Sequence, residues 1–202
     1  MGLYSRVVLP RLIDLVMRNK EAAQRRARII PGAIGAVLEV GVGSGLNLPF
    51  YTKQVRQLCG IDPSAELLKM ARARSLGAPF PVELVQRSAE ELPFGDATVD
   101  TVVVTWTLCS IPDPARALRE MRRVLRPAGR LFFVEHGLSP DARVRAWQER
   151  INPFWKGLAG GCNVNRKIDD LIRSAGFEIG ELQTEYLPGP RPMTYTYEGS
   201  AR

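Results

Sequence analysis

A glycine-rich turn constrains this chain more than any other feature of its sequence. The segment 37–47 reads VLEVGVGSGLN, in which apolar residues typical of a buried strand run into glycines at positions 41, 43 and 45. Glycine permits a tight turn and lets a ligand approach the backbone where a side chain would collide. In a protein that alternates strands and helices, such a turn predicts a site for a nucleotide-like cofactor.

The spacing of the glycines narrows the type of cofactor. A dinucleotide-binding turn has glycines at its first, third and sixth positions, and the last one packs the helix against the strand. Here the sixth position is Leu46, and the third glycine comes one residue early. An acidic residue, Glu39, also lies two positions before the first glycine. This pattern suits a cofactor that has no pyrophosphate and disfavours a nicotinamide-dependent oxidoreductase.

A second acidic residue follows the next predicted strand. Residues 58–62 read as a short strand that ends at Asp62, 17 residues after Gly45. An acid at this distance commonly binds the ribose hydroxyls of a nucleotide. Pro63 stops the strand directly afterwards. The alternative is that Asp62 serves only as a turn or helix-cap residue before Ser64.

The rest of the chain continues the alternation of strands and helices. The patterns predict strands at 36–40, 57–62, 81–87, 101–104 and 131–134, and helices near 47–53, from Ser64, at 114–125 and ending near Gly176. A sixth strand begins at 177–179, and the turn at 188–190 makes the strand at 193–197 its antiparallel neighbour. The sequence therefore predicts one α/β domain over 1–202, with a doubly wound, Rossmann-like sheet of seven strands that is mostly parallel and has an antiparallel C-terminal strand.

Residues 3–30 predict an amphipathic helix with a basic face. Its apolar residues recur at helical spacing, and its basic residues outnumber the acids Asp14 and Glu21: Arg6, Arg11, Arg18, Lys20, Arg25, Arg26 and Arg28. The whole chain carries a net charge of +7. We expect residues 1–30 to form a lid over the cofactor or substrate site. An interfacial helix on an anionic membrane surface and a merely solvated face are the alternatives.

Several functional classes find no support in the sequence. No run of about 18 apolar residues predicts a membrane-spanning helix, and no signal peptide is recognisable. The three cysteines, Cys59, Cys109 and Cys162, are far apart and form no CxxC pair, so they indicate neither a disulfide framework nor a metal site. We therefore expect a cytoplasmic protein without a metal, with peripheral membrane contact as an alternative and with its oligomeric state open.

Further motifs support a resemblance to a known family. They are SAEELPF at 88–94, Asp100, and LREMRRVLRPAGR at 118–130, followed by an apolar strand. With the glycine-rich turn and Asp62, this set resembles the class I S-adenosylmethionine (SAM)-dependent methyltransferases, of the quinone-methylating and methyltransferase-11 type. The resemblance implies a SAM cofactor, S-adenosylhomocysteine as product, and a small-molecule acceptor.

A narrower resemblance points to one subfamily. The segments TLCS at 107–110, VEH at 134–136, NPFW at 152–155 and GCNVNR at 161–166 resemble methyltransferase-like proteins that include alkyl thiol methyltransferases. The usual cysteine and threonine of the glycine-rich turn are Val42 and Ser44 here. The hydrophobic N-terminal membrane segment of that subfamily is not recognisable, so membrane residence is not implied.

The resemblance assigns cofactor-binding roles position by position. The glycines line the methionine part of SAM, Asp62 holds the ribose, and residues 63–64 and 88–90 border the adenine. Thr105 at the end of the fourth strand faces the methionyl amino group. The full set is Glu39, Gly41, Gly43, Gly45, Asn47, Asp62, Pro63, Ser64, Ser88, Ala89, Glu90, Thr105 and Leu108.

The candidate catalytic residue is His136, the only histidine. It ends the fifth strand, at the sheet edge where ligands bind, and its near-neutral pKa suits a general base. A structural role is the alternative, and Cys162 in the nearby segment is either reactive or part of the pocket wall. Aromatic residues on the predicted substrate side, two of them near an Asn-Pro loop, favour a hydrophobic acceptor: Trp106, Trp147, Phe154 and Trp155.

The acceptor itself is best predicted as a thiol, with a phospholipid amine or a quinol as alternatives. Nucleic acid is disfavoured, because residues 105–108 read TWTL where base-amine methyltransferases carry an Asn/Asp-Pro-Pro-aromatic element. The basic N-terminal segment also lacks the interleaved aromatics that stack on bases. A non-catalytic SAM-binding protein is a further alternative that no motif supports.

Overall fold

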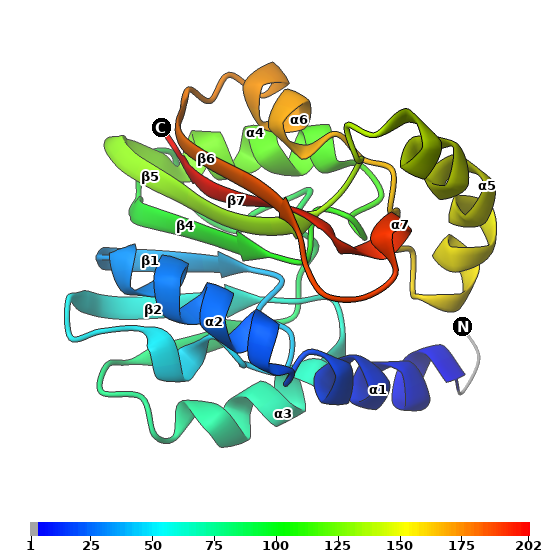
Figure 1. Cartoon of the computed structure of the whole chain (residues 1–202). Coiled ribbons are helices and arrows are strands. Elements are labelled where there is room, and N and C mark those ends of the chain that lie inside the picture. The colour runs from blue at the N-terminus through cyan, green and yellow to red at the C-terminus, as the bar shows by residue number, and fades with distance from the viewer. Residues whose placement is uncertain (1–3) are drawn as a thin grey trace.

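The computed structural model of the chain describes residues 4–202 and is built on one seven-stranded sheet in the order β3-β2-β1-β4-β5-β7-β6 (Figure 1). Strand β7 runs antiparallel to both of its neighbours, and β1 pairs in parallel with β2 and β4. This confirms the predicted mostly parallel sheet with an antiparallel C-terminal strand. The strands are β1 Gly35–Val40, β2 Val55–Ile61, β3 Val82–Val85, β4 Val99–Thr105, β5 Leu125–His136, β6 Ile179–Tyr186 and β7 Tyr195–Ala201.

Helices cover both faces of the sheet (Figure 1). Alternate residues of the central strand β4 face opposite ways: Val102 and Val104 join the core that includes α4 and α6, whereas Val103 joins the core on the other face. All three valines are fully buried, as expected for a central parallel strand. The helices are α1 Leu9–Val16, α2 Lys20–Ile29, α3 Ala65–Ser75, α4 Pro114–Val124, α5 Ala142–Leu158, α6 Ile168–Ser174 and α7 Arg191–Thr194.

The predicted helix at 3–30 is divided in two, and its first residue lies outside the described part of the chain. A π-helical turn at Tyr4–Val8 leads into α1, and α2 begins after Asn19. The Asn19 side chain accepts a hydrogen bond from the Ala22 N–H at 2.8 Å and donates one to the Val16 carbonyl at 2.9 Å. Asn19 therefore ends one helix and caps the next, which a continuous apolar stripe did not reveal.

Two other local predictions were wrong. The helix expected near 47–53 is only a 3₁₀ turn at Leu48–Phe50, since Pro49 lacks an N–H and the Asn47 side chain is engaged elsewhere. The Asn-Pro loop expected at 152–153 is instead part of α5, which continues through Pro153. Within residues 4–202, no helix combines the length and the apolar character needed to cross a membrane.

Candidate active site

A cavity of about 880 Å³ lies beside the ends of β1, β2 and β4. Ten of the thirteen predicted cofactor residues line it, whereas Gly45, Glu90 and Leu108 do not. The ten are Glu39, Gly41, Gly43, Asn47, Asp62, Pro63, Ser64, Ser88, Ala89 and Thr105. Segments that lie far apart in the sequence thus meet at one edge of the sheet, where open α/β folds bind ligands.

Asp62 closes the end of β2 against the glycine-rich turn. Its Oδ2 accepts a hydrogen bond from the Gly43 N–H at 3.0 Å, and its Oδ1 accepts one from the Ser64 N–H at 2.8 Å. Burial raises the pKa of Asp62 to about 6, against the lowering effect of these two N–H donors. The turn and cap role considered as an alternative is therefore present, and the same carboxylate also lines the cavity.

The three glycines of the turn differ in how much space a Cβ atom would find at each of them. A Cβ on Gly41 would lie 2.1 Å from the Thr107 Oγ1, and φ there is +72°. A Cβ on Gly43 would meet only the Gly41 carbonyl oxygen, at 3.9 Å, so this backbone opens onto space. Gly45 packs instead against Leu48 and Ala71 of α3, which explains why it does not line the cavity.

A buried polar network joins the ends of β1 and β4. The Asn47 Nδ2 donates to the Glu39 Oε1 at 2.9 Å and to the Thr105 Oγ1 at 3.0 Å, while the Tyr51 hydroxyl donates to the Glu39 Oε2 at 2.8 Å. The Arg26 Nε donates to the Asn47 Oδ1 at 2.9 Å. Burial raises the pKa of Glu39 to about 7, although Tyr51, Asn47 and the Arg26 charge favour its ionised form.

Arg26 was not among the predicted site residues. It comes from α2, is 4 % exposed, and lines the cavity. Its guanidinium also lies over the Trp106 ring, 5.0 Å from the ring centroid. Desolvation lowers its pKa to about 10, so it remains a cation at neutral pH. The sequence offered no signal for this residue beyond membership of the basic N-terminal segment.

Hydrogen bonds explain why Leu108 and Glu90 lie away from the cavity. The Leu108 N–H donates to the buried Glu135 carboxylate at 3.0 Å, and the side chain is fully buried in the core. Glu90 accepts a hydrogen bond from the Ser88 hydroxyl at 2.8 Å and another from the Asp113 N–H at 2.7 Å. Its side chain therefore caps the approach to α4, and its predicted contact with adenine stays a prediction.

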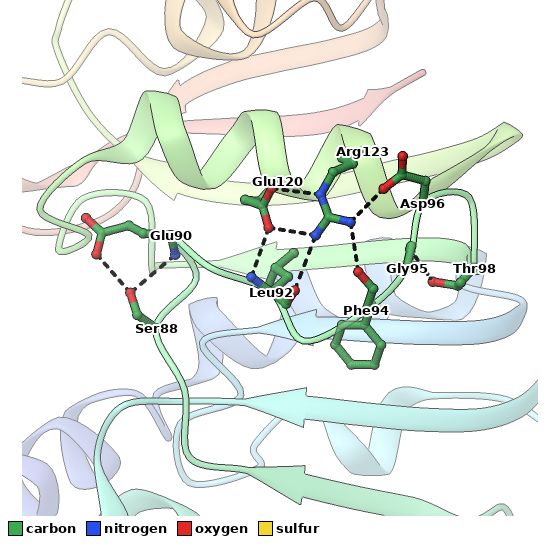
Figure 2. Close-up of polar contacts among 9 residues, drawn as sticks. All are labelled: Ser88, Glu90, Leu92, Phe94, Gly95, Asp96, Thr98, Glu120 and Arg123. Atoms are coloured by element: carbon green, nitrogen blue, oxygen red, sulfur yellow. Dashed lines mark hydrogen bonds and ion pairs between the residues drawn. The ribbon is translucent and has the colours of Figure 1, made fainter.

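The motif at 118–130, which begins in α4, positions the segment that carries Ser88 and Ala89. Figure 2 shows Glu120 and Arg123 of α4 contacting residues 92–96, which follow that segment in the sequence. Glu120 accepts a hydrogen bond from the Leu92 N–H at 3.0 Å, and Arg123 donates to the Phe94 carbonyl at 2.8 Å. The paired Arg123 guanidinium holds the pKa of Glu120 near 2. Glu120 and Arg123 do not line the cavity themselves, but they hold the segment next to Ser88 and Ala89, which do.

The N-terminal helix α1 forms another wall and is fastened to the glycine-rich turn. Leu9, Ile13 and Met17 line the cavity with apolar side chains. Asp14, which is 6 % exposed, accepts a hydrogen bond from the Ser44 hydroxyl at 2.5 Å and pairs with Arg74 of α3 at 2.9 Å. The contacts of Asp14 with Ser44 and Arg74, which we call the latch, therefore join α1 to the turn and to α3.

The predicted aromatic pocket is not formed as expected. Trp106 lines the cavity, in a left-handed conformation with φ of +49°. Trp147 and Phe154, on the surface of α5, are 59 % and 83 % exposed. The Asn-Pro segment is helical, so it turns Phe154 outwards instead of presenting it to a loop-bound pocket.

His136 also lies away from the cavity wall. Its Nε2 is 3.1 Å from the Cys162 Sγ, and its Nδ1 is buried without a hydrogen-bond partner among residues 4–202. Cys109 lies beside the same pair. The spacing of the three residues in the sequence gave no sign of this cluster. The general-base role of His136 stays a prediction.

Comparisons with known proteins agree with this geometry. A family model described as a methyltransferase domain matches residues 38–133. The chain is similar to human thiol S-methyltransferase TMT1B, with 35 % identity over 80 % of this chain and 67 % of that one. It is 36 % identical to a Cereibacter sphaeroides phosphatidylethanolamine N-methyltransferase, over 85 % of this chain and 83 % of the relative.

A solved structure extends the likeness to the fold. A SAM-dependent methyltransferase from Thermotoga maritima superimposes with a TM-score of 0.68 and 23 % identity, over 98 % of each chain. Because one fold can host many activities, the family assignment relies on the sequence relatives together with the fold. The chain belongs to the class I SAM-dependent methyltransferases and uses SAM as its cofactor.

Proposed function

We propose that the chain transfers the methyl group of SAM to the thiol of a small hydrophobic acceptor. The observation that carries this proposal is the character of the cavity, which joins a buried polar edge at Glu39 and Asp62 to an apolar wall from Leu9, Ile13 and Met17. The first can hold a polar cofactor, and the second suits an apolar acceptor. A thiol is favoured because the similar human protein is named a thiol S-methyltransferase.

The polar edge has the chemistry that SAM requires. Two buried carboxylates, Glu39 and Asp62, have raised pKa values, so a cationic ligand would stabilise their ionised forms. Gly43 leaves room for close approach to its backbone. We propose that Asp62 accepts hydrogen bonds from the ribose, that Glu39, Asn47 and Thr105 orient the methionyl end, and that residues 63–64 and 88–89 border the adenine.

The protein's part in the reaction is alignment and exclusion of water. When bound, SAM supplies a methyl group activated by a sulfonium, for an in-line displacement. The walls hold the acceptor sulfur in line with that methyl group, and such positioning can lower a barrier by about 7–11 kcal/mol. A thiol with a pKa of about 8.5 is partly ionised at neutral pH, so its proton can pass to water without a dedicated base.

The test is a competition among acceptors with a labelled methyl donor. We expect a short alkyl thiol to be methylated and the alcohol of the same shape to be inert. Phosphatidylethanolamine vesicles and a reduced quinone are the comparison acceptors. Methylation of either of these without thiol methylation would overturn the thiol assignment and leave the methyltransferase assignment intact.

A phospholipid acceptor at a membrane surface is the second candidate. Leu12, Leu15 and Val16 of α1 are 47 %, 67 % and 57 % exposed. The same helix carries the exposed cation Arg11, and the turn that follows it carries the exposed cation Arg18. An amphipathic helix of this kind can lie on an anionic bilayer. The similar bacterial protein is named for a phospholipid substrate.

Vesicle co-sedimentation tests this second candidate. Binding to anionic vesicles that falls in high salt and falls again in a Leu15→Ser/Val16→Ser variant would support a peripheral location. A Leu76→Ser variant is the matched control, because Leu76 is exposed at the end of α3, on another helix. No binding to anionic vesicles would contradict membrane contact, and equal binding to neutral vesicles would contradict the role of the cations.

A further inference from the structure

We propose that Cys109, His136 and Cys162 form a binding site for one soft divalent metal ion of the Zn²⁺ type. The ligand atoms of the three residues all lie within 4.8 Å of one another, and the His136 Nε2 lies 3.1 Å from the Cys162 Sγ. The cluster is separate from the predicted cofactor edge, since none of the three residues lines the cavity.

The residue types and their spacing suit zinc. Two thiolates and an imidazole are ligands that zinc prefers, at about 2.3 Å for sulfur and 2.0–2.1 Å for nitrogen. Tetrahedral angles at those bond lengths place the ligand atoms about 3.5–3.8 Å apart. The 3.1 Å separation between His136 and Cys162 is slightly shorter than this value, and no other pair of ligand atoms is more than 4.8 Å apart. Small side-chain adjustments would therefore complete the geometry.

The backbone holds the three ligands in place. His136 ends β5 and is paired with Thr196 of β7. The Cys109 carbonyl oxygen accepts hydrogen bonds from both the N–H and the Nδ2 of Asn163, each at 2.9 Å. Asn163 directly follows Cys162, so these bonds fasten the segment of one cysteine to the segment of the other. Ligands carried on such fixed segments are preorganised for a metal.

The neighbouring Cys109 thiol and burial raise the pKa of Cys162, and a bound cation would offset this cost by stabilising the thiolate. The Trp155 Nε1 donates a hydrogen bond to the Cys162 Sγ at 3.4 Å. The half-buried Arg166 guanidinium, held by the Ile111 carbonyl at 2.7 Å, places a positive charge near both thiols. Outer donors of this kind tune metal ligands. The Trp155 N–H and the Arg166 charge would therefore support the thiolate forms of cysteine, which bind metal.

The site would fasten the wall of the cavity. Its ligands come from the segment after β4, from the end of β5 and from the connection between α5 and α6. Ser110 and Gly160, which are close in sequence to the two cysteines, line the cavity. Three protein ligands leave one tetrahedral position of the ion for water or another small ligand. Metal binding would therefore stabilise this wall without replacing any cofactor contact.

Cobalt(II) titration of the full chain tests the proposal. The protein is first treated with a chelator and a phosphine reductant, and its three thiols are counted. We expect one Co²⁺ per chain, with sulfur-to-cobalt charge-transfer absorption and the d–d bands of tetrahedral cobalt, both abolished by one equivalent of Zn²⁺. Cys109→Ser and Cys162→Ser should lose the charge-transfer absorption in part or entirely, and His136→Gln should weaken metal affinity.

Cys59→Ser is the matched control, because Cys59 is a half-buried thiol in β2 outside the cluster. It should keep both the stoichiometry and the spectrum. Trp155→Phe should weaken zinc binding by about 10-fold. Circular dichroism and S-adenosylhomocysteine binding show whether each variant is folded.

Two results would overturn the metal site. One is wild-type protein with three free thiols that gives no charge-transfer absorption with Co²⁺. The other is a folded Cys109→Ser/Cys162→Ser variant that retains the wild-type spectrum. Neither result depends on turnover, so the methyltransferase proposal is tested separately.

Discussion

Two sides of the cavity are built in different ways. One is the predicted cofactor edge at the ends of β1, β2 and β4, and the other is the covering wall formed by α1 and by Arg26 of α2. At the cofactor edge, seven of the ten predicted residues lie in two short segments, 37–47 and 58–64, that each contain a strand end and its turn. The covering wall depends on contacts between distant segments, such as Asp14 with Ser44 and Arg26 with Asn47. A local motif can therefore specify the first region, whereas only the assembled fold creates the second.

The largest expected effect lies at the cofactor edge, where Asp62→Ala should weaken S-adenosylhomocysteine binding by at least about 100-fold. The variant removes the carboxylate that we propose accepts two ribose hydrogen bonds, and hydrogen bonds to charged groups contribute about 1.5–3 kcal/mol each. Isothermal titration calorimetry measures the loss. Wild-type affinity in this variant would show that Asp62 only closes the turn.

Substitutions of Gly41 and Gly43 distinguish a glycine needed for packing from one needed for space beside a ligand. Gly41→Ala should lower the free energy of unfolding by about 2–5 kcal/mol, because its Cβ would collide with Thr107 and its φ is positive. Gly43→Ala should cost only about 1–2 kcal/mol of stability and mainly weaken cofactor binding. Urea denaturation and calorimetry measure both quantities. Equal losses of stability would contradict this distinction.

The covering wall is probed by Asp14→Ala, which removes the latch between α1 and the turn. We expect the free energy of unfolding to fall by about 1–3 kcal/mol, since a buried, charged hydrogen-bond network is broken. The KM for the acceptor should rise more than that for SAM, because α1 supplies the apolar wall. Arg11→Ala is the control: its exposed pair with Glu66 should contribute less than about 1 kcal/mol. Unchanged acceptor kinetics in a folded Asp14→Ala protein would rule out the wall role.

The smallest effect concerns pH. Asp62 has a raised pKa of about 6, and we propose that its ionised form accepts the ribose hydrogen bonds. S-adenosylhomocysteine affinity should therefore be fully present above about pH 7, and should fall by up to about tenfold per pH unit below pH 6. Asp62→Asn should bind weakly but without this step. A step that persists in Asp62→Asn would assign the titration to another group, such as Glu39.

The sequence anticipated the sheet and most of the cofactor edge. Strand ends were readable because Pro63 stops β2 and the glycines stop β1, and parallel strands bring such ends to one edge. Ten predicted residues line the cavity there. Arg26 was missed, because its hydrogen bond to Asn47 joins a helix to a turn 21 residues away. No local pattern distinguishes it from the other arginines of the same segment.

By itself, the sequence determined the alternating strands, the antiparallel C-terminal strand and the glycine-rich turn, since these follow from periodicity and from backbone restrictions that act over a few residues. Tertiary structure decided which side chains face the cavity and which face the core. It turned Phe154 outwards, tied Leu108 to Glu135, and brought Cys109, His136 and Cys162 together. These outcomes depend on packing and hydrogen bonds between segments whose separation along the chain carries no periodic signal.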